Sequence, residues 1–348
     1  MLKEMLMYPL SFGSDNHSGV HPEVFAALLQ ANQGYCPAYG DDPLTRSVLA
    51  DLQALFGGDC EVSFVMTGTG ANVVALQSLI NSFHAIICAE TSHINVDECG
   101  AVQKCTQARL SPLKTPDGKL TPDLIAPRLM GDRDQHHSQF RIVSVSQSTE
   151  YGTLYSLEEL KALADFAHAH NMLLHIDGAR LANAAAALNC SLKTMTRDVG
   201  ADIVSFGGTK NGMLFGEAII SFCPELSSNI RFYRKQCTQL FSKMRYISAQ
   251  YKAYLQDDLW LHNARHANRM ALLLGQKLAA LPQVQITQEV KVNSLFVILP
   301  EQVIEPLQEQ YLFYTWDEAR HEVRLMCSFD TTEAHLDAFM GTLQAMLA

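Results

Sequence analysis

The sequence lacks several features that would assign it to other classes of protein. No apolar run reaches the roughly 18 residues of a membrane-spanning helix, so no membrane segment is expected. Positive charge is not in excess: the net charge is −10 and the pI about 5.7, which would repel a polyanion and excludes nucleic acid as a main partner. Residues 1–14 lack a continuous apolar stretch and a small-residue cleavage site, so we expect no signal peptide.

Paired cysteines and clustered metal ligands are also missing. The nine cysteines are odd in number, scattered, and without a C-x-x-C pair, which predicts reduced thiols in a cytoplasmic protein. His262 and His266 could share a helix face, but no third ligand is evident nearby. We therefore expect no metal.

What is present is a pattern of alternating strands and helices. The 348 residues allow roughly two domains of ~150 residues, and 48% hydrophobic residues allow a sizeable core. Strands are predicted at 62–66, 85–88, 141–147, 172–176 and 201–206, and helices at 71–83 and 157–170. Ser156 and Glu159 form a capping-box pattern at the start of the second helix. This alternation predicts an α/β fold.

The last hundred residues indicate a smaller α+β domain. Residues 222–245 look mostly helical, and 250–281 predict one or two long helices. Strands at 294–299 and 322–327 flank a helix near 305–310, and 330–347 predicts a final helix. We place the large domain at 1–248 and the small domain at 249–348.

Chemically capable residues follow several of these strands. Asp177 comes just after strand 172–176, and Lys210 lies in a glycine-containing loop after strand 201–206. Ligands bind in open α/β sheets at the carboxyl ends of the strands. The clustering therefore predicts a ligand site at that edge.

The segment Thr67-Gly68-Thr69-Gly70-Ala71-Asn72 joins a strand to a helix. Its glycines let the backbone approach an anion, and free N–H groups at the helix start favour a phosphate. A dinucleotide fingerprint would need a third glycine where Val73 stands, so a lone phosphate fits better than a pyrophosphate. A plain tight turn is the alternative.

The segment His175-Ile176-Asp177-Gly178-Ala179-Arg180 places a carboxylate at a strand end. Asp177 could stabilise a protonated pyridine nitrogen and so keep a cofactor ring electron-poor. The alternative is a helix cap with a surface ion pair.

The segment Ser205-Phe206-Gly207-Gly208-Thr209-Lys210-Asn211-Gly212 is the most specific of the three. Its glycines leave room for a bulky ring, and the Lys210 amine can form a Schiff base if burial or a nearby cation lowers its pKa. A solvated loop lysine is the alternative for this motif alone.

In this order, the three motifs resemble the fold-type-I pyridoxal-phosphate enzymes, and more narrowly the threonine aldolase branch of the β-eliminating lyases. The resemblance covers nearly the whole chain. It also includes Ser14-Asp15-Asn16, Tyr39-Gly40-Asp41-Asp42-Pro43, His93 in TSHINVDECGA, and Val323-Arg324-Leu325. It implies a large domain with a mostly parallel seven-stranded sheet covered by helices.

The resemblance also implies cofactor contacts. Lys210 would carry pyridoxal 5'-phosphate, and Asp177 would pair with its ring nitrogen. Arg180 would lie near the ring hydroxyl and also contact substrate, and His93 would stack on the ring and take part in catalysis. Gly68 and Thr69 would bind the phosphate.

The remaining implied contacts involve substrate and a neighbouring subunit. Arg324 and Ser14 would hold the substrate carboxylate, a task that suits a bidentate guanidinium. Tyr39 would reach the substrate and Arg245 the phosphate from a neighbouring subunit, in a homodimer or homotetramer with shared sites.

One loop departs from the pattern. Many threonine aldolases have Thr-His-Asn-Gly where this sequence has Thr149-Glu150-Tyr151-Gly152. Glu150 or Thr149 could replace the missing histidine, or His93, alone or through a water, could remove the proton instead.

The resemblance thus implies a lyase that cleaves β-hydroxy-α-amino acids of the L-threonine or L-allo-threonine type to glycine and an aldehyde. Two alternatives remain: another pyridoxal-phosphate-dependent β-elimination, and a non-catalytic protein that binds a phosphate ligand on the same scaffold.

Overall fold

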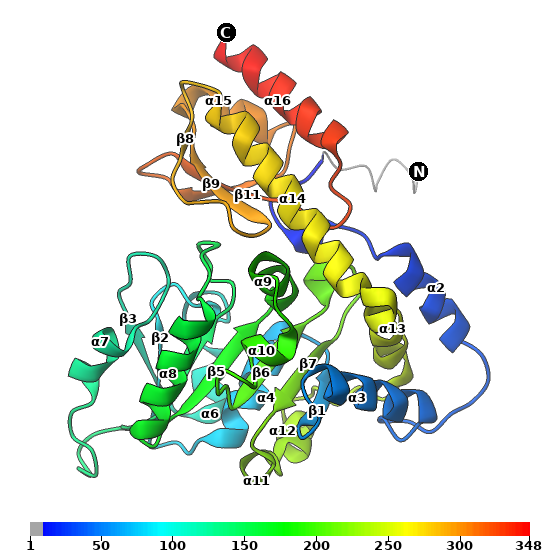
Figure 1. The fold of residues 1–348 in the computed structure, drawn as a ribbon, viewed down its shortest axis with the longest axis vertical. Coiled ribbons are helices and arrows are strands. Elements are labelled where there is room, and N and C mark those ends of the chain that lie inside the picture. Colours follow the sequence, from blue (N-terminus) through cyan, green and yellow to red (C-terminus); the bar gives the residue numbers. More distant parts are fainter. Residues whose placement is uncertain (1–9) are drawn as a thin grey trace.

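The computed structural model describes residues 10–348 and contains two sheets (Figure 1). The large sheet consists of β1 Glu61–Val65, β2 His84–Ala89, β3 Arg109–Leu113, β4 Gln139–Ser146, β5 Leu173–Gly178, β6 Ile203–Gly207 and β7 Glu217–Ser221. Their spatial order is β1-β7-β6-β5-β4-β2-β3. Only β7 runs antiparallel to its neighbours, β1 and β6. The predicted α/β class, with a mostly parallel seven-stranded sheet, is confirmed.

Helices cover both faces of this sheet (Figure 1). One face packs against α4 Gly68–Leu79, α6 Ala101–Thr106 and α12 Ile230–Gln236. The other packs against α3 Pro43–Leu55, α8 Leu157–Ala169, α9 Leu181–Leu188, α10 Leu192–Met195 and α13 Arg245–Leu255. Shorter or peripheral elements are η1 Asp15–His17, α2 Pro22–Ala31, α5 His93–Val96, α7 Pro122–Ile125, η2 Ala126–Arg128, η3 Thr209–Asn211 and α11 Pro224–Ser227.

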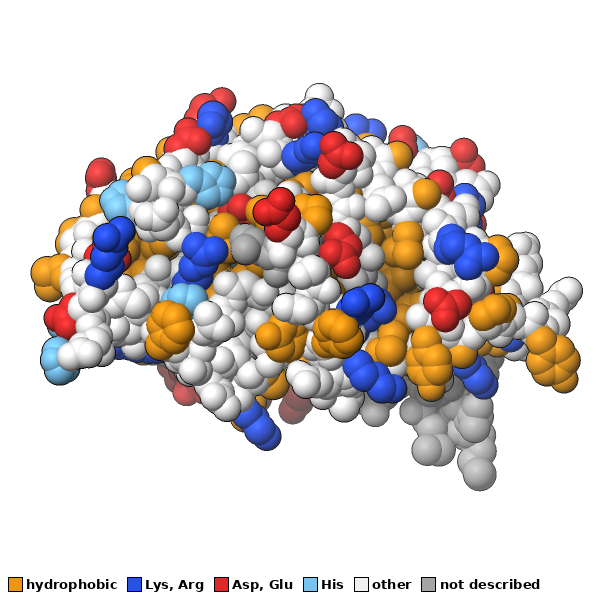
Figure 2. All heavy atoms as spheres, turned by 90° about the horizontal axis from the view of Figure 1, so that it is seen from below, with side chains coloured by type: hydrophobic (Ala, Val, Ile, Leu, Met, Phe, Trp, Pro, Cys, Tyr) orange, Lys and Arg blue, Asp and Glu red, His pale blue; other side chains and the backbone are white. Residues whose placement is uncertain are grey.

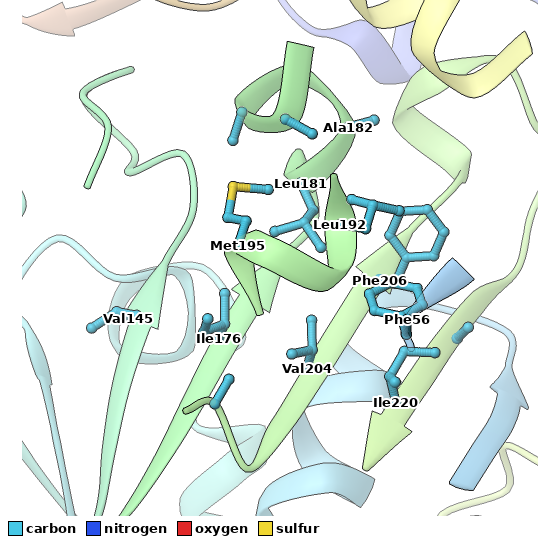
Figure 3. Packing of buried hydrophobic residues seen from close by; sticks show 14 of the residues in the cluster. Phe56, Val145, Ile176, Leu181, Ala182, Leu192, Met195, Val204, Phe206 and Ile220 are labelled. Atoms are coloured by element: carbon cyan, nitrogen blue, oxygen red, sulfur yellow. The ribbon is translucent and has the colours of Figure 1, made fainter. Parts of the chain in front are cut away.

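The alternation of side chains along β6 shows how the sequence supplies two cores. Ile203 belongs to the core under α4, whereas Val204 and Phe206 belong to the opposite core. Figure 3 shows Val204 and Phe206 with Phe56 and Met195, which come from the helix side. A strand buried on both faces is expected to be mostly apolar, and β6, which is buried over its whole length, has Ser205 as its one polar side chain.

The smaller domain has an antiparallel sheet in the order β10-β11-β9-β8. Its elements are η4 Gln256–Asp258, α14 Leu259–Ala279, β8 Gln285–Ile286, β9 Ser294–Ile298, α15 Glu301–Gln308, β10 Tyr314–Asp317, β11 Glu322–Met326 and α16 Glu333–Leu347. Phe12 also packs in this second core, although it lies near the start of the chain. The boundary at residue 248/249 stays a prediction.

Several local predictions can be compared directly. The capping box of Ser156 and Glu159 at α8 is confirmed. The predicted helix 71–83 instead runs from Gly68 to Leu79, because Ile80 is already extended. Phe83 is therefore not on a buried helix face; it is 58% exposed. The prediction that 222–245 is mostly helical is wrong for 237–244, where Thr238 has a φ of +61°.

Two further predictions concern the ends and the surface of the chain. The prediction for residues 1–14 falls largely on 1–9, outside the described residues. Within 10–348, no helix combines the length and the apolar character needed to cross a bilayer.

Candidate active site

The site lies where β1, β5 and β6 reach the same edge of the large sheet. A cavity of about 320 Å³ opens there, within the range of about 300–1,000 Å³ typical of ligand pockets. Its lining includes the predicted residues Gly68, Thr69, His93, Asp177 and Lys210. The three sequence motifs therefore converge, as expected for strands that end at one edge.

The start of α4 forms one wall of the cavity. Thr67 precedes the helix in an extended conformation, and its hydroxyl accepts a hydrogen bond from Gly70 N at 3.0 Å. A Cβ on Gly68 would meet no atom within 4 Å, so the backbone there is open to a ligand. Free N–H groups and the positive end of the helix dipole favour an anion at this point.

Lys210 is held in η3 at the opposite wall. Its neighbour Asn211 donates hydrogen bonds to the Tyr254 hydroxyl at 2.7 Å and to Trp260 O at 2.8 Å. The charge of Arg180, together with burial, lowers the pKa of Lys210 below its usual range. A lowered pKa supplies the neutral amine that attack on an aldehyde requires.

Arg180 is fixed by two other segments of the chain. Its Nε and NH2 donate to Asp15 Oδ2 and Oδ1 at 2.7 and 2.8 Å. Asn293 donates a further hydrogen bond to Asp15 Oδ2 at 3.1 Å. Burial alone would raise the pKa of Asp15, but the Arg180 charge and these hydrogen bonds lower it.

Asp177 lies at the end of β5 and is 7% exposed. Its Oδ1 accepts from Ala179 N at 3.0 Å, and its Oδ2 accepts from Asn72 Nδ2 at 2.8 Å. Asn72 Nδ2 also donates to Glu98 Oε1 at 2.8 Å, and the same oxygen lies 2.9 Å from His93 Nδ1. The hydrogen bond to Glu98 raises the pKa of His93.

Glu150 lines a smaller adjoining hollow with His93, Asp177 and Lys210. Its Oε1 accepts from His93 N at 2.9 Å and from the Ser146 hydroxyl at 2.7 Å. Its buried Oε2 has no hydrogen-bond partner among the described residues. Burial raises the pKa of this carboxyl.

These features fit pyridoxal phosphate. The cavity combines a half-buried lysine of lowered pKa, a helix start suited to an anion, and a carboxylate at a strand end. Lys210 would hold the aldehyde carbon, Gly68 and Thr69 the phosphate, and Asp177 the ring nitrogen.

Comparison with known proteins identifies the family. The family model of the beta-eliminating lyases matches residues 11–302. The chain belongs to the beta-eliminating lyase family.

Three of its relatives span more than nine tenths of the chain. It is 40% identical over 339 residues to a low specificity L-threonine aldolase of Pseudomonas sp. (strain NCIMB 10558), covering 97% of this chain and 98% of the relative. It is 43% identical over 322 residues to the one from Pseudomonas aeruginosa, covering 92% and 93%. The solved structure of Leishmania major threonine aldolase matches with a TM-score of 0.92 at 29% identity, covering 98% and 100%. The resemblance expected from the motifs is confirmed.

Six of the expected site residues do not line the main cavity of this beta-eliminating lyase, and two of them, Glu150 and Arg180, line the smaller adjoining hollow instead. Ser14 caps η1 and lines a separate hollow. Arg324 is half-buried on β11, donates to Gly13 O at 3.3 Å and lies over the Trp316 ring. Burial, together with the Arg180 charge, lowers the pKa of Arg324.

Tyr39 and Arg245 lie farther out. Tyr39 is 48% exposed and has a φ of +61°. Arg245 begins α13, and its NH1 donates to Gly34 O at 3.1 Å. Neither side chain lines the cavity of its own chain.

The motifs did not assign roles to Asn72, Glu98 and Glu217, which the structure brings to the site. Asn72 and Glu98 both stood inside quoted motifs. Glu217 lies in a strand that was not predicted, yet it lines the cavity and accepts from Gly208 N at 2.7 Å. Its signal was a single carboxylate in the apolar run Glu217–Ser221, since a buried carboxylate needs a partner or a function.

Proposed function

We propose that this beta-eliminating lyase is a pyridoxal-phosphate-dependent aldolase that cleaves L-threonine or L-allo-threonine to glycine and an aldehyde. The supporting observation is the cavity in which Lys210, Asp177, His93 and the start of α4 converge. The names of the Pseudomonas and Leishmania relatives support the reaction class.

When bound, the cofactor supplies an electron sink for the bond that breaks. The protein supplies orientation and charge. Asp177 would pair with the ring nitrogen, and Arg180, held by Asp15, would lie near the ring hydroxyl and the substrate. Arg324, with Ser14, would hold the substrate carboxylate so that the scissile bond is correctly oriented.

The proton of the β-hydroxyl needs an acceptor. The Nδ1 of His93 is engaged by Glu98, which leaves Nε2 to accept the proton directly or through one water. Glu150 accepts the backbone N–H of His93 and lines the smaller adjoining hollow with it, and its Oε2 has no hydrogen-bond partner among the described residues. We assign proton acceptance to His93 and contact with the β-hydroxyl to Glu150.

The site is completed by a second copy of the chain. Tyr39 and Arg245 sit on a surface that also exposes Phe25, Leu29 and Tyr35. Hydrophobic side chains gather on the right-hand side of Figure 2, the side on which α2 and α3 lie in Figure 1. Exposed apolar patches mark interaction sites, which supports a homodimer or homotetramer with shared sites.

The nine free thiols support a reducing, cytoplasmic compartment. 

Lys210→Ala tests the function. We expect the purified wild-type enzyme to release glycine and aldehyde from threonine or allo-threonine, with no ammonia or pyruvate, and the variant to release neither. After borohydride reduction, mass spectrometry should find the cofactor on the peptide that contains residue 210. Ammonia and pyruvate as the main products would instead identify a β-elimination, and turnover by the variant would refute the role of Lys210.

A further inference from the structure

The side chains of His93 and Asp177 border the same cavity and are connected through two further residues. Glu98 and Asn72 complete the chain His93–Glu98–Asn72–Asp177, with every link between 2.8 and 2.9 Å. Neither connecting residue lines the main cavity.

The direction of each hydrogen bond follows from the donors that are present. A carboxylate only accepts, so the hydrogen between His93 and Glu98 sits on Nδ1 of the histidine. The Asn72 amide nitrogen has two hydrogens and donates one to each carboxylate. Turning the amide round would place its oxygen against two carboxylates, which would be repulsive.

The burial and backbone conformation of Glu98 are energetically unfavourable, which indicates a function. Its side chain is fully buried, and its Oε2 has no partner among the described residues. An unpartnered buried oxygen has lost its hydration without gaining a hydrogen bond in return, which destabilises the folded state. Glu98 is also carried on a turn in which Cys99 has a φ of +51° and Gly100 of +70°, the left-handed region that residues other than glycine rarely adopt.

We propose that Glu98 is a positioning residue that fixes His93 with its hydrogen on Nδ1 and its Nε2 free, and that Asn72 joins this pair to Asp177 as one hydrogen-bonded unit. The inference rests on the proposed function, in which Nε2 accepts the proton of the β-hydroxyl. An acidic orienting group of this kind sets the tautomer and strengthens the basicity of a catalytic histidine.

The charged groups that face His93 determine the expected pH dependence. They are Glu98 on the turn before α6, Asp177 on β5 and Lys210 after β6, while Glu150 accepts the backbone N–H. Glu98 raises the pKa of His93, and the neutral ring is the active form. Removing the carboxylate should therefore move the acid limb of the pH–rate profile to lower pH.

The test uses nitrogen NMR of protein labelled at its histidine side chains, with and without cofactor. The signals of His93, one of 13 histidines, are identified by their loss in His93→Gln. In the wild type we expect hydrogen on Nδ1. In Glu98→Ala we expect loss of this fixed tautomer and a His93 pKa below that of the wild type, because the hydrogen bond that raises it is gone. Glu98→Gln should keep the tautomer, because its amide oxygen still accepts, but lower the pKa.

Activity gives a second reading. We expect kcat/KM for threonine to fall about 10- to 100-fold in Glu98→Ala, with partial recovery in Glu98→Gln. The matched control is Asp202→Asn, which removes a buried carboxylate 2.9 Å from His168 Nε2 at the opposite edge of the sheet. It should alter the signals of His168 and leave those of His93 unchanged.

Unchanged His93 signals in folded Glu98→Ala would overturn the proposal, even if activity fell. If that variant does not fold, Glu98→Gln provides the test. A His93 pKa in this variant equal to that of the wild type would also overturn the proposal. A shifted tautomer without any glycine-forming activity in the wild type would instead count against the proposed function alone.

The Asn72 part of the proposal is tested by Asn72→Ala. Asp177 then loses a hydrogen bond, and we expect cofactor binding to weaken about tenfold by equilibrium dialysis. Cofactor affinity equal to that of the wild type would contradict the proposed role of Asn72 in joining Glu98 to Asp177.

Discussion

Arg180 and Asp15 form a bidentate ion pair between positions 165 residues apart, with N–O distances of 2.7 and 2.8 Å. Asp15 belongs to η1 near the start of the chain, and Arg180 follows β5. The pair does more than connect two segments, because the fixed Arg180 charge is the largest influence that lowers the pKa of Lys210. A residue near the N-terminus thus helps to set the reactivity of the amine in the cavity.

Asp15→Asn should be strongly destabilising. Removing one partner of a buried ion pair leaves an uncompensated charge, which costs about 3–5 kcal/mol in the free energy of unfolding. Because the folded-state pKa of Asp15 is lowered, its stabilising contribution is present above the ordinary carboxyl pKa and is lost as the pH falls through the lower one. Urea unfolding of wild type and variant between pH 7 and pH 3 measures both effects.

The control for this variant is Asp165→Asn, which breaks an exposed pair with Lys161 on α8. Exposed pairs contribute about 0–1 kcal/mol, so little change is expected. Equal losses of unfolding free energy in the two variants would show that the buried Asp15–Arg180 pair contributes no more to stability than an exposed pair.

Much of the large domain could be predicted because its strands are short apolar runs bounded by motif residues. Strands 172–176 and 201–206 fall within one or two residues of β5 and β6. The strand β7 was missed because its apolar part is only the three residues Ala218–Ile220, between the polar residues Glu217 and Ser221. At the sheet edge, β3 was missed because it contains Pro112, a residue that strands tolerate mainly at edges.

The site was predictable where chemistry is local to a motif and hidden where it depends on tertiary contacts. Lys210 follows β6, and Asp177, predicted just past a strand, is the next-to-last residue of β5, so their meeting could be inferred from topology alone. Asn72 contacts Asp177, which is 105 positions away in the sequence, and Glu98, which is 26 positions away. No local sequence pattern specifies such long-range contacts. The same holds for Asp15, whose partner was not evident from Ser14-Asp15-Asn16.

Gly207→Ala should disturb the floor of the cavity. A Cβ at Gly207 would lie 2.5 Å from Ala179 O, a backbone atom of the neighbouring segment that cannot move cheaply. Overpacking of this kind lowers the free energy of unfolding by about 1–3 kcal/mol.

Gly341→Ala is the matched control, because nothing lies within 4 Å of a Cβ there and the position is inside α16. It should stabilise the protein by about 0.5–1 kcal/mol. Thermal and urea unfolding compare the two, and a Gly207 variant as stable as the wild type would contradict the steric reading.

Glu217→Gln should change how stability depends on pH in the cofactor-free protein. Burial raises the pKa of Glu217 to about 7. A carboxyl with a raised folded-state pKa gives its full stability below its ordinary pKa, and this is lost as the pH rises toward 7. The wild type should therefore lose about 3 kcal/mol more than the variant between pH 4.5 and pH 8. Urea unfolding across that range measures the difference, with the exposed Asp123→Asn as control; parallel curves for wild type and Glu217→Gln would exclude an effect of this carboxyl.

Arg245→Ala should weaken cofactor retention while leaving the cavity of its own chain intact. Arg245 does not line that cavity, and its guanidinium is held at the surface by Gly34 O. If it serves a neighbouring copy, mixing this variant with Lys210→Ala should restore one complete site in each hybrid dimer. Random mixing then predicts about a quarter of wild-type activity, because half of the dimers are hybrids and each has one working site of two. Arg265→Ala, another exposed arginine, should retain its own activity before mixing. Hybrids verified by mass spectrometry that remain inactive would show that each chain builds its site alone.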